Sequence, residues 1–181
     1  MADTHDKNGK MYPKHVVNDP KTHMAWFNLY ESEDSVVMHE LKNPNIICWY
    51  RNPVGKTTGN SLRIAYRLGD DRKTLHPDFI FFEKCGDREM PAIVDPHGLH
   101  LADTLPKLKG IARYVEDFGE TYSRYWFVSD YKGKAMYLDM KDSETRTIVN
   151  EASDAFECFA KCAKVYMDQP LSKVKEGYRK K

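Results

Sequence analysis

Long apolar runs are missing from this chain of 181 residues. No run approaches the roughly 18 consecutive apolar residues that a membrane-spanning helix needs. The opening stretch, MADTHDKNGKMYPKH, lacks the apolar core of a secretion signal. The four cysteines include no Cys-x-x-Cys pair, and Cys158 and Cys162 are spaced for packing within a helix. We therefore expect a cytoplasmic protein with reduced thiols and no membrane partner.

An excess of charge of either sign is missing as well. Lysine and arginine number 28 and aspartate and glutamate 27, so the formal net charge is +1. A whole-molecule field of this size will not attract nucleic acid, and any such binding needs a local basic patch. The hydrophobic content of 41% and charged content of 30% are typical of a globular domain. The length suits one domain with a substantial core.

A complete phosphate-binding loop is also missing. The stretch NPVGKTTGNS contains Gly55-Lys56-Thr57, but the motif requires a glycine five residues before Gly55, and that position is Tyr50. The backbone cradle for a nucleotide phosphate cannot be built here. The stretch instead predicts a basic loop between two strands.

The order of expected elements predicts an α/β or α+β fold around one mixed sheet. We expect a flexible N-terminal arm over 1–20, a folded domain over 21–167 and a basic tail over 168–181. Within the domain, apolar spacing and turn residues predict the following elements: a helix over 22–42 that the acidic stretch 31–34 could divide, strands over 45–52 and 61–68, two strands within 76–98, a helix from Thr104 to Gly119, a hairpin over 125–140 and a last helix over 142–167.

Two aspartates lie at the ends of the most apolar segment, HPDFIFFEKCGDREMPAIVDPHG. Gly86-Asp87 suits a two-residue type II′ hairpin turn, and counting outward from that turn places Asp78 opposite Asp95. Directly opposed residues have Cβ atoms roughly 5 Å apart, and His97 would point to the same face. Two carboxylates this close repel each other, and Mg²⁺ or Mn²⁺ would remove the repulsion. The segment therefore predicts a metal site at the end of the sheet.

Two other interpretations of the aspartates stay open at this point. Asp-Pro is an ordinary turn former, so Asp95-Pro96 could be a turn with no metal. Pro91 removes one backbone donor from the strand and could introduce a bulge. A bulge would shift the register by one residue and turn Asp95 away from Asp78.

The string HPDFIFFEKCGDREMPAIVDPHGLHLADTLPKLKGIARYVEDFG, preceded by NPNIICWYRNP, resembles a known domain. It is similar to the C-terminal nuclease-like domain of type III restriction and DEAD/DEAH-type helicase subunits, a divergent branch of the PD-(D/E)xK nucleases. The similarity covers about residues 25–140. It implies an α/β, restriction-endonuclease-like core in which helices flank a mixed sheet of four to six strands.

The resemblance also implies the metal ligands by position. Asp78 corresponds to the aspartate of the "PD" motif, and Asp95 to the acid of the "(D/E)xK" motif. The acid of the opening helix best matches Glu33, with Glu31 as a second choice. These carboxylates would hold Mg²⁺ or Mn²⁺.

Basic residues complete the implied site. His97 stands where the superfamily usually has lysine, and it would position or deprotonate the attacking water. Lys107 would steady the phosphate or the water, as in related nucleases that keep a basic or amide residue there. Arg51, Lys56 and Arg63 are candidates for contacts to the DNA backbone.

The resemblance thus implies a metal-dependent DNA endonuclease, with a role in restriction or antiviral defence. Its partners would be DNA and a helicase-type ATPase, either a separate subunit or a fused motor, and homodimer formation stays open. A second interpretation is an inactive module of the same fold that binds DNA or docks onto a helicase. A third is a transition-metal site made by four residues of DPHGLHLAD: Asp95, His97, His100 and Asp103.

Overall fold

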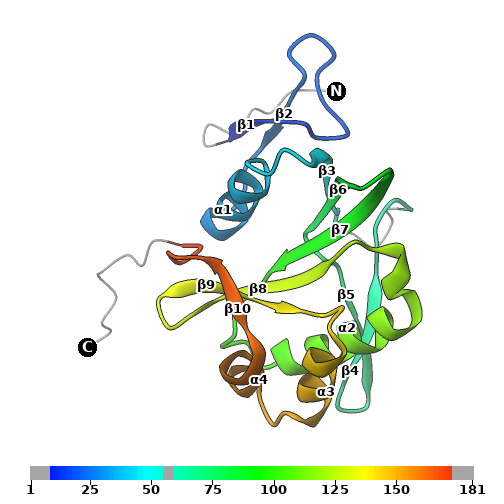
Figure 1. Ribbon diagram of the computed structural model, residues 1–181, viewed down its shortest axis with the longest axis vertical. Helices are drawn as coiled ribbons and strands as arrows, with labels where there is room; N and C mark the ends of the chain where they lie inside the picture. The colour runs from blue at the N-terminus through cyan, green and yellow to red at the C-terminus, as the bar shows by residue number, and fades with distance from the viewer. Residues whose placement is uncertain (1–8, 55–58, 173–181) are drawn as a thin grey trace.

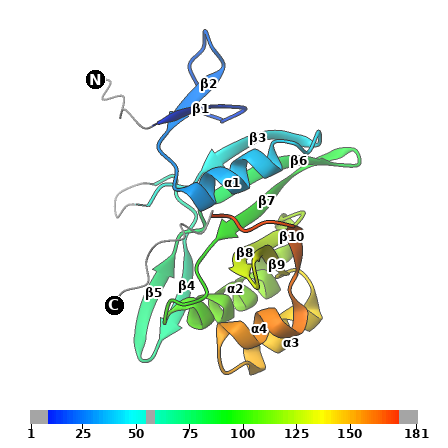
Figure 2. The same cartoon turned by 90° about the vertical axis from the view of Figure 1, so that its left-hand side faces the viewer.

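A six-stranded mixed sheet forms the centre of the computed structural model, which describes residues 9–54 and 59–172 (Figures 1 and 2). The strand order is β10-β9-β8-β7-β6-β3. The expected mixed α/β fold is therefore confirmed. The strands of this sheet are β3 (Ile46–Arg51), β6 (Phe79–Cys85), β7 (Arg88–Pro96), β8 (Tyr125–Tyr131), β9 (Lys134–Asp139) and β10 (Lys164–Met167).

Helices lie on both faces of the sheet, as Figure 2 shows. Helix α1 (Glu31–Glu40) covers one face. Helix α2 (Thr104–Phe118), which is followed by a 3-10 turn over Gly119–Thr121, covers the other face together with α3 (Ser143–Glu151) and α4 (Ala155–Cys162). Within the described residues, no helix combines the length and apolar character needed to cross a membrane.

Side-chain alternation along the strands divides the core into two clusters. Phe79 and Phe81 of β6 face α1, where they pack with Trp49 and Val37. Ile93 of β7 faces the other side and packs with residues of α2, α3 and α4. The neighbouring strands β7 and β8 are parallel, and α2 forms the crossover between them. The end of β7 therefore lies close to the start of α2.

Two small hairpins extend from this body. Strand β1 (Lys10–Pro13) pairs with β2 (Met24–Phe27), and β4 (Ile64–Leu68) pairs with β5 (Asp71–Leu75). The β4–β5 hairpin packs on α2 at Gly110. A Cβ atom at this glycine would lie 2.5 Å from Tyr66 Cβ, so the close approach requires a residue without a side chain.

The N-terminal part differs from the expectation. Residues 24–27 form β2, and the helix expected over 22–42 begins only at Glu31. Residues 10–13, which were expected in a flexible arm, form β1, and Tyr12 is buried. Trp26 fits the helical spacing of the apolar residues that follow it, and its pairing with Met11 of β1 is not visible in that local spacing.

The C-terminal part differs too. The helix expected over 142–167 is divided into α3, α4 and β10. Asp142 begins α3 by accepting a hydrogen bond from the Glu144 amide, and Asp154 begins α4 by accepting one from the Glu157 amide. The second cap starts a new helix where the apolar spacing alone predicted a continuous one. In the expected basic tail, Leu171 is buried and its amide donates to Asp130.

Candidate active site

The β6–β7 hairpin has the register that the sequence predicted. Gly86 takes a φ of 62° in the two-residue turn, and Phe79 pairs with Val94. Pro91 pairs with Phe82 without a shift in register, so the bulge considered above does not form. Continuing this register by one residue places Asp78 opposite Asp95.

A hydrogen bond joins the two aspartates. The Asp78 amide donates to Asp95 Oδ1 over 2.9 Å. Asp95 is only 2% exposed, and its second oxygen, Oδ2, accepts no hydrogen bond from any described residue. Most buried polar atoms in proteins have a partner, so an unpartnered carboxylate oxygen is the kind of group that a bound cation satisfies.

Burial and a neighbouring carboxylate raise the pKa of each of the two carboxyls. For Asp78, burial and the charge of Glu33 raise the pKa to about 6 against the opposing influence of Arg51 and Lys107. For Asp95, burial and the charge of Asp78 raise the pKa well above its ordinary value. Both ionised forms are therefore costly in the metal-free protein.

The pair fits a hard divalent cation. Mg²⁺ commonly takes one or two protein carboxylates and completes its shell with waters and phosphate oxygens. Within residues 9–54 and 59–172, no group of three or more His, Cys, Asp or Glu side chains is arranged to hold a metal. The site therefore offers two protein carboxylates, and the expected third ligand is not assembled with them.

Glu33, the expected third ligand, has other partners. Its Oε1 accepts from Arg51 Nη2 over 2.7 Å, and its Oε2 accepts from the Tyr30 amide at the start of α1 over 2.7 Å. Glu33 lies near enough for its charge to raise the pKa of Asp78. It therefore acts on the carboxylate pair through its charge and holds Arg51 beside the site.

His97 and Lys107 lie together at the same end of β7. Lys107 Nζ is 3.1 Å from His97 Nε2 and 2.9 Å from Asp103 Oδ2. An ammonium group only donates, so His97 Nε2 accepts and the ring proton sits on Nδ1. Burial and the charge of Lys107 lower the pKa of His97 to about 4. His97 is thus neutral at pH 7, and its Nε2 lone pair is already engaged.

The remaining predicted residues are not brought to one place. Arg51 is half-buried in its pair with Glu33, whereas Arg63 is exposed. Lys56 lies outside the described residues. His100 is exposed, and Asp103 is bound by Lys107. The four residues considered for a transition-metal site therefore do not assemble into one within the described chain.

Sequence reasoning missed two features of the site. Tyr125 begins β8 beside β7; its buried hydroxyl has no partner among the described residues, and the charge of Asp95 contributes to its raised pKa. A cavity of about 670 Å³ lies next to His97, and its lining includes Tyr30, Ser129 and Asp130. Tyr30 directly precedes α1, and Ser129 and Asp130 belong to β8. No local motif could therefore have placed them beside β7.

A family model described as the YagJ family matches residues 13–168 of the chain. The protein YagJ of Escherichia coli (strain K12) is 40% identical over 129 residues, which make up 71% of this chain and 52% of that relative. The chain thus spans about half the length of the curated relative it matches. No solved structure matches the chain.

Proposed function

The chain belongs to the YagJ family, and we propose that it is a metal-dependent nuclease that hydrolyses phosphodiester bonds in DNA. The observation that carries the proposal is the carboxylate pair. The Asp78 amide donates to Asp95 Oδ1 at the end of the β6–β7 hairpin, and the buried Asp95 Oδ2 has no described partner. The motifs that carry the resemblance to the nuclease-like domains of helicase subunits include the same two residues.

Asp78 and Asp95 would hold one Mg²⁺ or Mn²⁺ ion. When bound, the metal supplies Lewis-acid activation of water and offsets negative charge at the phosphate. Cation binding would also favour the ionised forms of both carboxyls, whose pKa values are raised in the metal-free protein. Glu33 takes a supporting role, because its oxygens are already engaged by Arg51 and the Tyr30 amide.

Lys107 would provide the cationic side chain of the site. Its ammonium group lies against His97, the residue that stands where related nucleases have lysine. We assign Lys107 to stabilising charge that develops on the phosphate, and His97 to positioning Lys107. A role for His97 as general base is disfavoured, since its pKa of about 4 makes it a weak base and Nε2 already accepts from Lys107.

The wider setting follows from the same resemblance. A helicase-type ATPase would deliver DNA to the site, in restriction or antiviral defence inside the cytoplasm. The E. coli relative is about twice as long as the aligned part, which leaves room for a further region in that protein. Supplying a helicase-type ATPase in the cleavage assay tests whether activity of this chain depends on such a partner.

Metal binding and plasmid nicking test the proposal together. Titration with Mn²⁺, followed by electron paramagnetic resonance, should show one site in the wild type and a loss of more than about tenfold in affinity in Asp95→Asn or Asp78→Asn. Supercoiled plasmid with Mg²⁺ or Mn²⁺ should be nicked by the wild type and spared by both variants. Asp87→Asn, at the exposed turn of the same hairpin, is the matched control.

Absence of a Mn²⁺ site dependent on Asp78 and Asp95 would refute the nuclease proposal. Mn²⁺ and DNA binding without cleavage, with and without an ATPase partner, would instead favour the second function, an inactive DNA-binding module. That alternative draws on His97 standing in place of lysine and on the lack, among the described residues, of a group of three or more side chains arranged to hold a metal.

A further inference from the structure

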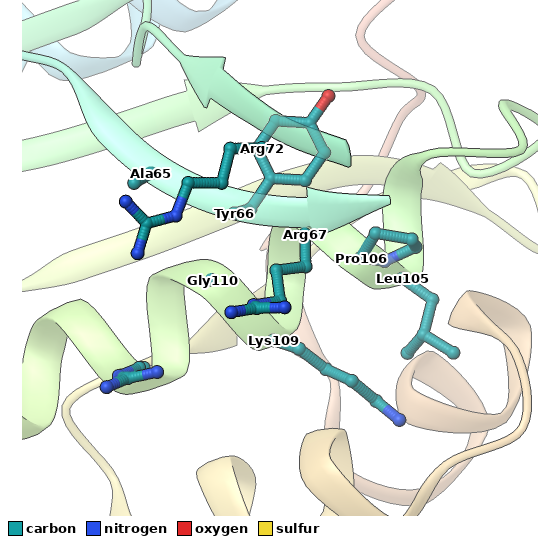
Figure 3. Close-up of a pocket in the computed structure, with 9 residues that line it drawn as sticks. Ala65, Tyr66, Arg67, Arg72, Leu105, Pro106, Lys109 and Gly110 are labelled. Carbon is teal, nitrogen blue, oxygen red and sulfur yellow. The ribbon is translucent and has the colours of Figure 1, made fainter. Parts of the chain in front are cut away.

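A groove lined by basic residues lies between the β4–β5 hairpin and helix α2 (Figure 3). Its volume is about 540 Å³. Apolar parts of Tyr66, Leu105 and Pro106 line it together with four cations, and none of its lining residues carries a carboxylate. We call it the basic groove, and its cations are Arg67, Arg72, Lys109 and Arg113.

The four cations form two pairs of like charge. Arg67 and Arg72 are direct cross-strand partners in the β4–β5 hairpin. Lys109 and Arg113 are four residues apart on α2, so they are neighbours on the helix surface. Like charges opposed across strands or spaced four apart on a helix destabilise the element that carries them. An anion in the basic groove would remove both repulsions.

The cations have few partners of their own. Within residues 9–54 and 59–172, no ion pair involves any of the four. Lys109 donates only a long hydrogen bond, 3.4 Å, to the Ala152 carbonyl. Arg67 extends from the hairpin toward α2 (Figure 3). The guanidinium groups are therefore available to an anionic ligand, and their planar forks match phosphate oxygens.

A chain of hydrogen bonds connects the basic groove with the candidate active site. Tyr66 lines the groove, and its hydroxyl donates to Asp103 Oδ2 over 3.2 Å. The same oxygen is 2.9 Å from Lys107 Nζ, which contacts His97. Helix α2 presents Lys107 to the site and Lys109 and Arg113 to the groove. One rigid element thus fixes the position of the groove relative to Asp78 and Asp95.

We propose that the basic groove binds the sugar-phosphate backbone of the DNA strand that continues from the phosphate held at the active site. The inference rests on the proposed function for its substrate, because DNA is the polyanion on which that site would act. Arginines that form no ion pair with the described residues, in a groove that no carboxylate lines, suit the successive phosphates of a strand. Phosphate contacts carry no sequence information, so binding should be independent of sequence and should weaken with salt.

The experiment measures DNA binding without cleavage. Fluorescence anisotropy of a 20-base-pair duplex in EDTA compares the wild type with Arg67→Ala/Arg113→Ala. At about 100 mM salt the double variant should bind roughly tenfold more weakly, and its slope of log affinity against log salt should fall by about two. Lys84→Ala/Arg88→Ala, which removes the same charge from exposed positions at the far end of the β6–β7 hairpin, should bind like the wild type.

The arms of the experiment separate the groove from the nuclease proposal. Loss of DNA binding in the groove variant, with no metal site and no cleavage in the wild type, leaves the groove inference standing while the nuclease proposal fails. Equal binding by the groove variant and the control overturns the groove inference, whatever the outcome for cleavage. Failure of the wild type to bind DNA also overturns it.

Two further probes identify the anion. Inorganic phosphate or pyrophosphate at millimolar concentration should not displace the duplex, since a single phosphate contacts only part of the groove. Tight binding of inorganic phosphate without DNA binding would overturn the proposal in favour of a small-anion site. Equal binding of polyglutamate would overturn it in favour of an acidic protein. Circular dichroism confirms that each variant is folded.

Discussion

At the residue scale, the candidate active site keeps two carboxylates in an unfavourable state. Asp95 is buried with an unpartnered oxygen, and Asp78 adds its own charge beside it. An arrangement of this kind lowers the stability of the metal-free protein and is relieved by protonation or by a cation. Proton and metal binding should therefore compete at the same oxygens.

The first prediction concerns the pH dependence of stability in EDTA. The folded pKa of Asp78 is about 6, above its ordinary value of 3.8. Between these two values the folded protein binds more protons than the unfolded chain, so this residue contributes stability as the pH falls through about 6 toward 4. Thermal melting is measured in steps of pH from 7.5 to 4.5. On acidification, the melting temperature of Asp78→Asn should rise less, or fall more steeply, than that of the wild type.

Other groups also titrate in that range, so the informative quantity is the difference between the two proteins. Asp87→Asn provides the control because Asp87 is exposed at the turn of the same hairpin. Parallel melting profiles for the wild type and Asp78→Asn would contradict the prediction.

The second prediction concerns His97. The charge of Lys107 helps to lower the pKa of this histidine to about 4. In Lys107→Met the charge of Lys107 is gone, while burial, the largest cause, remains together with the opposing charges of Asp103 and His100, so the pKa of His97 should rise toward 6.5 without reaching it. Proton NMR titration of the ring in EDTA measures the change. Lys109→Met removes an equal charge from the groove side of the helix and should leave the pKa of His97 nearly unchanged. A His97 pKa that stays near 4 in Lys107→Met would contradict the contact between Lys107 and His97.

At the element scale, the sequence predicted what depends on local pattern. The turn at Gly86, the strands on either side of it and helix α2 follow from residues close together in the chain, and so does the opposition of Asp78 and Asp95. The engagement of Glu33 by Arg51 joins α1 to β3, and no spacing within one element could reveal it. Strand β5 was missed because its exposed, charged residues lack an apolar alternation.

The third prediction tests the attachment of the β4–β5 hairpin to α2. Alanine in place of glycine normally stabilises a helix by about 1 kcal/mol. In Gly110→Ala the new Cβ would lie 2.5 Å from Tyr66 Cβ and 3.2 Å from the Ala65 carbonyl oxygen, so the hairpin must move. We expect the free energy of unfolding to fall by about 1–3 kcal/mol, as measured by urea denaturation.

Gly59→Ala is the matched control for this experiment, because no heavy atom lies within 4 Å of a Cβ at that position. It should leave the stability almost unchanged. A more stable Gly110→Ala variant would show that the hairpin does not rest on α2 as described.

At the scale of the whole molecule, one arginine ties together elements that are distant in the chain. Arg124, which precedes β8, donates to Glu40 of α1 and to Glu83 of β6. Tyr166 of β10 donates to Glu40 over 2.7 Å. The arginine side chain is 12% exposed, so these ion pairs are largely removed from water. The network fixes α1 against the sheet on the face opposite α2.

The fourth prediction follows from this burial. Arg124→Met leaves two buried carboxylates without the cation that pairs with both, and removing one member of a buried ion network costs about 3–5 kcal/mol. Chemical denaturation should show that loss. Lys134→Met breaks an exposed ion pair with Asp168, whose side chains are 48% and 90% exposed, and should change stability by less than about 1 kcal/mol. Equal losses in the two variants would contradict the network's structural role.

The parallel junction between β7 and β8 has a consequence for how the protein folds. The hairpins β6–β7 and β8–β9 each join neighbouring segments, whereas β7 meets β8 only after the whole α2 crossover has closed a long loop. We expect that junction to form late. A newly synthesised chain would then carry its two aspartates in an early hairpin while the facing edges of β7 and β8 are still open to aggregation.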